Sequence, residues 1–73
     1  MVTPSEIARL QAYLRRKFDN ALITLKERSK TDDSVEVQLG DEFIGVIYKD
    51  TEEGETSYAF NMAILDIDLD GQG

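Results

Sequence analysis

Three aspartates spaced two residues apart are the side chains whose types and spacing best suit chemistry. Asp66, Asp68 and Asp70 directly precede Gly71, which reproduces the D-x-D-x-D-G opening of a calcium-binding loop. Such a loop also needs a bidentate Glu at its twelfth position, and that position falls beyond Gly73. The apolar residues between the aspartates equally suit a strand whose acidic outer edge discourages edge pairing. We therefore expect no metal site, and keep the three aspartates as candidates for a weak divalent-cation site.

The residue types that the sequence lacks narrow the catalytic options. With no His and no Cys among 73 residues, the chain cannot form a Ser-His-Asp triad, a thiolate nucleophile or a His or Cys zinc site. Carboxylate, Lys, Tyr and hydroxyl chemistry remain, and these need a pocket that so short a chain can hardly enclose. We expect a protein that is not an enzyme and has neither cofactor nor catalytic residue. A carboxylate-based enzyme that uses Asp66, Asp68 and Asp70 is the alternative.

Charge is divided unevenly along the chain. Residues 1–30 carry seven Lys or Arg against three acids, a net of +4, whereas residues 31–73 carry one Lys against twelve acids, a net of −11. The first part includes a basic cluster made of Arg9, Arg15, Arg16 and Lys17. This cluster could bind phosphate, but an isoelectric point near 4.3 opposes nucleic-acid binding. We expect the cluster to complement the dipole of a helix, and we expect no nucleic-acid partner.

The first predicted element is an N-terminal helix of about residues 4–18. Thr3 can cap this helix, Pro4 suits its first turn, and Glu6 can reach back to Thr3 and close a capping box. The apolar residues that follow recur at helical spacing and share one face; they are Ile7, Leu10, Leu14 and Phe18. The helix is therefore amphipathic, with one apolar stripe for packing.

After Asn20 the apolar period changes to two, which is the period of strands with one buried face. The expected strands cover about residues 21–28, 34–39, 42–49 and 57–69, and residues 70–73 form a frayed tail. Gly40-Asp41 suits a type II′ hairpin turn, and Gly45 within the third strand indicates a bulge or a close backbone approach. Past Ile64 the alternation slips by one residue, which a bulge, a bend or a separate short strand would explain.

The three turns between these strands agree on one apolar face. They place Leu25 opposite Val37, Val37 opposite Ile44, and Val46 opposite Phe60. Such agreement between independently placed turns favours a single register. It predicts an α+β fold in one domain, residues 1–73, with the N-terminal amphipathic helix packed on a four-stranded antiparallel meander sheet in the order 1-2-3-4.

The same register leaves an apolar stripe on the face of the sheet that the helix does not cover. It brings Phe43 opposite Ala63 and Ile47 opposite Ala59, and the two small alanines would make the larger side chains part of a flat patch. A flat apolar patch suits a two-fold interface, so we expect these four residues to bind protein, with a homodimer as one form. Pairing of the basic helix with the acidic strands of another copy is a competing geometry.

Four segments of the sequence together resemble a known family. They are residues 10–16, 32–37, 40–46 and 57–68, and they are similar in content and order to short alphaproteobacterial proteins classed as a domain of unknown function. The resemblance implies a bacterial, cytoplasmic protein and supplies no activity, ligand or site residue. No apolar run approaches the roughly 20 residues of a membrane span. We therefore expect a small acidic protein of unknown function that serves as a non-catalytic protein-interaction module, bound to a protein partner or to itself and not to a membrane.

Overall fold

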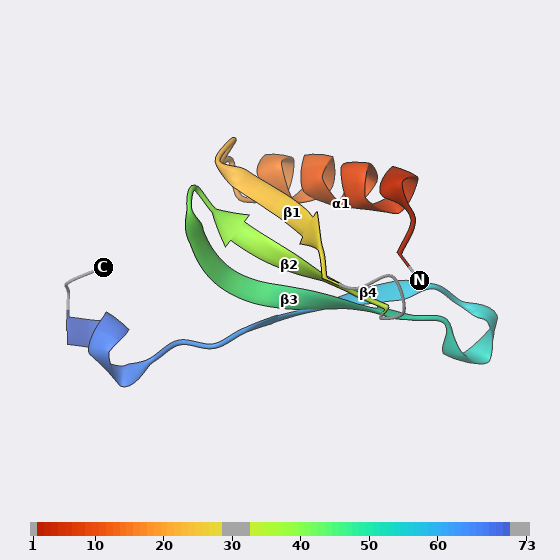
Figure 1. Cartoon of the computed structure of the whole chain (residues 1–73). Coiled ribbons are helices and arrows are strands. Elements are labelled where there is room, and N and C mark those ends of the chain that lie inside the picture. Colours follow the sequence, from red (N-terminus) through yellow and green to blue (C-terminus); the bar gives the residue numbers. More distant parts are fainter. Residues whose placement is uncertain (1, 29–32, 71–73) are drawn as a thin grey trace.

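The computed structural model describes residues 2–28 and 33–70, and it shows one helix along one face of an open sheet (Figure 1). The elements in chain order are α1 (Pro4–Lys17), β1 (Ile23–Glu27), β2 (Ser34–Leu39), β3 (Glu42–Asp50), η1 (Glu52–Gly54), β4 (Ser57–Met62) and η2 (Asp66–Asp70). All neighbouring strands are antiparallel and lie in the order β1-β2-β3-β4. The predicted α+β meander is confirmed. No helix in the described part of the chain has the length and hydropathy that crossing a bilayer requires.

Helix α1 begins where its capping residues predict. The Thr3 hydroxyl accepts from the Glu6 backbone amide at 3.2 Å, and the Glu6 carboxylate accepts from the Thr3 amide at 2.9 Å. The helix ends at Lys17 with Phe18 as its C-cap, and Asp19 then turns the chain with a positive φ of 51°. Local side-chain hydrogen bonds therefore define the start of α1, and a backbone reversal defines its end.

The hydrophobic core lies between α1 and the β1–β2 half of the sheet, with one residue from β3. Its buried members are Val2, Leu14, Ile23, Leu25, Val35, Val37 and Ile47. Residues of β1 and β2 pair as predicted, with Leu25 opposite Val37. The turn at Gly40 also agrees with the prediction. Gly40 has a positive φ of +62° and the φ of Asp41 is not positive, which is the combination that a type II′ turn requires.

A bulge in β3 changes the predicted register of the second half of the sheet. Gln38 pairs with Phe43, but Val37 pairs with Gly45, so Ile44 is an extra residue on β3. Beyond this bulge each residue of β3 faces the side opposite to the one predicted. The predicted pairing of Val37 with Ile44 is therefore wrong, and Ile47 lies in the core with only 2% of its surface exposed.

Gly45 also lies very close to the backbone of β4. A Cβ atom built on Gly45 would lie 2.5 Å from the backbone carbonyl oxygen of Asn61. Both sequence-based readings of this glycine, a bulge and a close backbone approach, are therefore confirmed. The β3–β4 register also differs by one residue from the predicted one, because Phe60 pairs with Ile47 and not with Val46. The predicted pairing of Val46 with Phe60 is therefore wrong.

The fourth strand is shorter than the sequence indicates. β4 ends at Met62, so the predicted strand over residues 57–69 is wrong beyond that residue. The bulge bends β3 away from β4. The chain after β4 continues past the end of the sheet without a neighbouring strand (Figure 1). Residues 63–70, which we call the C-terminal arm, end in the short 3-10 helix η2. The predicted frayed tail covers residues 70–73. Its first residue, Asp70, ends η2, and the other three lie outside the described residues.

Candidate functional site

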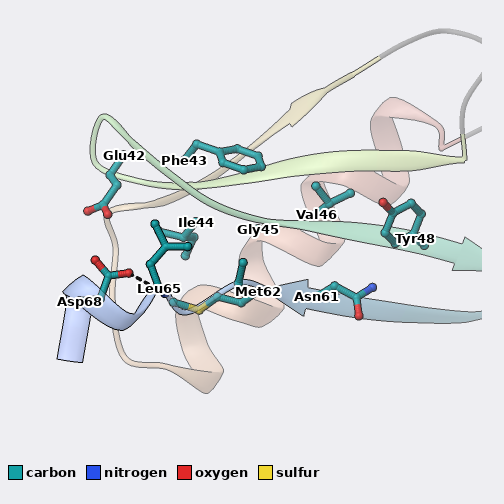
Figure 2. Close-up of a pocket in the computed structure, with 11 residues that line it drawn as sticks. Glu42, Phe43, Ile44, Gly45, Val46, Tyr48, Asn61, Met62, Leu65 and Asp68 are labelled. Carbon is teal, nitrogen blue, oxygen red and sulfur yellow. Dashed lines mark hydrogen bonds between the residues drawn. The ribbon is translucent and has the colours of Figure 1, made fainter.

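A hollow of about 570 Å³ lies on the outer face of the sheet, the face turned away from α1 (Figure 2). We call it the outer hollow. One wall is formed by Phe43, Val46 and Tyr48 of β3, and the other by Met62 of β4 and Leu65 of the C-terminal arm. The carboxylates of Glu42 and Asp68 stand at one end, as Figure 2 shows. The outer hollow is thus an open apolar depression with acidic side chains at one end.

The bulge in β3 produces the apolar wall of the outer hollow. Phe43 and Val46 are three residues apart, which in a regular strand would place them on opposite faces. Their partners on β2 are Gln38 and Glu36, which are two residues apart. Phe43 and Val46 therefore share the outer face, because the extra residue between them restores the alternation.

The predicted interface residues are only partly brought together. Phe43 lies on the outer hollow with 55% of its surface exposed, and Ala63 lines the edge of the same hollow. Ile47 is in the core, so its place in the predicted stripe is wrong. Ala59 is on the outer face but pairs with Tyr48. Val46 and Tyr48 lie on the outer face, where Ile47 was predicted. Gly45, which indicated a bulge in β3, was the sequence signal that could have predicted this.

Of the three aspartates in the calcium-loop pattern, the structure describes the side chains of Asp66 and Asp68. The Asp68 carboxylate accepts from the backbone amide of Leu65 at 3.1 Å and so closes the turn that leads into η2. Among the residues with described side chains, which exclude Asp70, no three His, Cys, Asp or Glu residues are close enough to hold a metal ion. The observed role of Asp68 is to shape the C-terminal arm.

A second apolar depression lies on the inner face, between α1 and the β3–β4 half of the sheet. We call it the inner groove. It has a volume of about 420 Å³ and continues into a smaller hollow of about 220 Å³. Its apolar walls include Tyr13 from α1, Phe18 at the C-cap of α1, and Ile47 and Phe60 from the sheet. Lys17 borders this groove, while Arg9 and Arg16 border an adjoining depression that shares Tyr13.

The fold and these surfaces can be compared with known proteins. A family model described as protein of unknown function (DUF3126) matches residues 6–68. The chain belongs to the DUF3126 family. This confirms the resemblance to a domain of unknown function that the sequence indicated. No curated protein and no solved structure matches the DUF3126 chain.

The DUF3126 chain also contains a polar cluster that the sequence analysis did not identify. Lys49 of β3 places its ammonium nitrogen 3.0 Å from one carboxylate oxygen of Glu6 and 2.9 Å from the other. The Tyr58 hydroxyl of β4 donates to the same carboxylate. Lys49, together with the Thr3 amide and the Tyr58 hydroxyl, lowers the pKa of Glu6 from 4.5 to about 2. The hydrogen bond to Glu6 raises the pKa of Tyr58.

This cluster holds the start of α1 against the sheet. Glu6 belongs to the first turn of the helix, whereas Lys49 and Tyr58 are directly paired residues of β3 and β4. The Glu6 carboxylate accepts hydrogen bonds from three partners at once, which favours its charged form. A carboxylate held ionised in this way is poorly suited to act as a general acid or base near neutral pH. Sequence spacing gives no sign of the cluster, because its members are far apart in the chain.

Proposed function

We propose that this DUF3126 protein is a non-catalytic protein-interaction module of the bacterial cytoplasm, and that the outer hollow binds its partner. The observation that carries the proposal is the gathering of exposed large apolar side chains around one hollow. Phe43, Tyr48, Met62 and Leu65 are all substantially exposed, and all line the outer hollow. Exposed apolar patches on small soluble proteins commonly mark interaction sites.

The chemistry of the outer hollow indicates what kind of partner segment it would take. Aromatic and Met side chains are enriched at the centres of protein interfaces, and Phe43, Tyr48 and Met62 supply these types. Glu42 and Asp68 add negative charge at one end of the hollow. An apolar side chain flanked by Lys or Arg would complement both features, since opposite charges at a rim favour encounter. The absence of Cys is compatible with a reducing compartment.

A comparative capture experiment tests this proposal. Wild type, Phe43→Asp and Leu22→Asp would be used as baits in native bacterial lysate at moderate salt. Leu22 is a matched control because it is 63% exposed and does not line the outer hollow. We expect mass spectrometry to identify a protein that wild type and Leu22→Asp recover and that Phe43→Asp loses.

The purified partner then allows the contact to be located. On titration into labelled protein, we expect the largest amide shift changes at Phe43, Val46, Tyr48, Met62 and Leu65. Equal recovery of the partner by Phe43→Asp, or shift changes confined to another surface, would contradict the proposal. Conversion of a metabolite by the purified protein would favour the enzymatic alternative instead.

A further inference from the structure

Beyond its first turn, which contacts Lys49 and Tyr58, α1 covers only about half the width of the inner face of the sheet. A helix with its side chains is about 10 Å across, and neighbouring strands lie about 4.8 Å apart, so one helix covers about two strands. α1 runs beside β1, and β4 lies at the opposite edge of the sheet (Figure 1). The inner groove is therefore the part of the inner face that lacks a covering helix, which α+β folds normally provide.

The C-terminal arm is apolar as well, but its large side chains are mostly exposed. Ile67 and Leu69 are 66% and 71% exposed, and Ile64 and Leu65 are similarly exposed. Four large aliphatic side chains within six residues are thus exposed, and exposed apolar surface concentrated in one segment is a candidate for binding another surface. Contact between the apolar arm and the apolar groove would therefore bury exposed apolar surface on both.

The arm cannot reach the groove of its own molecule from where it lies. Leu65 and Asp68 line the outer hollow, which places the arm on the outer side of the sheet, whereas the groove is on the inner side, between α1 and the β3–β4 half of the sheet. Moving the arm into its own groove would require it to leave these outer contacts and reverse direction directly after β4. The arm of another molecule can enter the groove without that reversal of direction.

Charge complements the match in apolar surface. The C-terminal arm, residues 63–70, carries three Asp and no Lys or Arg. The α1 side of the inner groove presents Lys17, and Arg9 and Arg16 lie beside it. An acidic, apolar segment would therefore place its aliphatic side chains in the groove and its carboxylates beside these cations, and opposite charges at a rim favour encounter and orientation.

We propose that the C-terminal arm of one copy fills the inner groove of a second copy, and that the exchange is reciprocal. Each sheet then gains the second half of its covering layer from its partner. Reciprocal exchange gives a two-fold dimer that closes at two copies, whereas one-directional exchange would extend into a filament. The arm contributes Leu65 and Asp68 to the outer hollow, so the dimer and the proposed partner site share the arm. Phe43 lies in neither the arm nor the inner groove, so Phe43→Asp tests the partner site separately from the dimer.

Mass measurements by light scattering test the dimer. Wild type at tens of micromolar should have twice the 8.2 kDa chain mass. Ile67→Asp and Leu69→Asp in the arm, and Tyr13→Glu in the groove, should each raise the dissociation constant at least about tenfold, since burial of one large aliphatic side chain corresponds to at least that factor. Leu22→Asp should leave it unchanged. The arm side chains are exposed, so circular dichroism should show that these variants remain folded.

Crosslinking identifies which surfaces meet. Because the sequence has no Cys, Leu69→Cys and Tyr13→Cys can be prepared as separate proteins, mixed, and treated with a short bis-maleimide. We expect a crosslinked pair joining position 69 of one chain to position 13 of the other, and none when Leu22→Cys replaces Tyr13→Cys. The proposal would be overturned by a monomeric wild type, by a dimer unaffected by Ile67→Asp and Leu69→Asp, or by growth beyond two copies. A crosslink within one chain that carries both Leu69→Cys and Tyr13→Cys would also overturn it.

Discussion

Replacement of Gly45 by alanine should destabilise the protein by about 3 kcal/mol. The new Cβ would lie 2.5 Å from the Asn61 carbonyl oxygen and 2.6 Å from a ring carbon of Phe60. The Phe60 ring can rotate away, but the carbonyl belongs to the backbone of β4, where Asn61 pairs with Val46. β4 must therefore shift away from β3. Overpacking typically costs about 1–3 kcal/mol, and a rigid backbone obstacle places Gly45→Ala at the upper end of that range.

Urea unfolding followed by far-UV circular dichroism measures this loss. A domain of this size has about 3–5 kcal/mol of net stability, so Gly45→Ala should lose more than half of its free energy of unfolding. Gly40→Ala is the control, because Gly40 has a φ of +62° and nothing within 4 Å of its Cβ position. That variant should lose only about 1–2 kcal/mol, the cost of a left-handed conformation. A smaller loss for Gly45→Ala than for Gly40→Ala, or a gain in stability, would refute the close-approach argument.

Three further predictions concern the polar cluster, the core and the aspartates. Because the pKa of Glu6 falls from 4.5 to about 2 on folding, its contribution to stability should be complete above about pH 4.5 and lost as the pH falls toward 2; urea unfolding at several pH values should show that Glu6→Gln lacks this part of the acid dependence. Ile47→Asp places a charge in the core and should abolish the cooperative thermal transition, whereas Val46→Asp on the outer face should retain it. Calorimetric titration with calcium should give no saturable micromolar site; such a site, abolished by Asp68→Asn, would contradict the expectation drawn from the incomplete loop pattern.

Local signals predicted the parts of the fold that depend on neighbours in the chain. The capping box at Thr3 and Glu6, the turn at Gly40 and the β1–β2 register all follow from residue types within a few positions of one another. The face to which each β3 residue beyond Ile44 points does not, because a strand has a period of two and a single extra residue reverses every later side chain. Gly45 indicated the irregularity, but a strand sequence alone does not say where the extra residue lies.

The candidate site was harder to predict than the fold because it depends on that reversal. Phe43 was correctly expected on the outer face, but Val46 and Tyr48 reach it only through the bulge at Ile44. The end of β4 was missed for a related reason. The alternation beyond Ile64 resembles a strand, yet an alternating segment forms a strand only where a neighbour continues beside it, and β3 bends away at that point.

The polar cluster has a consequence for how the protein folds. Glu6 takes part in two structures at once: it closes the first turn of α1 through Thr3, and it contacts Lys49 and Tyr58, which lie 43 and 52 positions away in the chain. Because the same carboxylate stabilises the first turn of α1 and its contact with β4, we expect formation of the helix and docking of β4 to occur in a single cooperative transition. Helix ends in small proteins usually fray independently, but amide protons in the first turn of α1 should exchange together with those of β4.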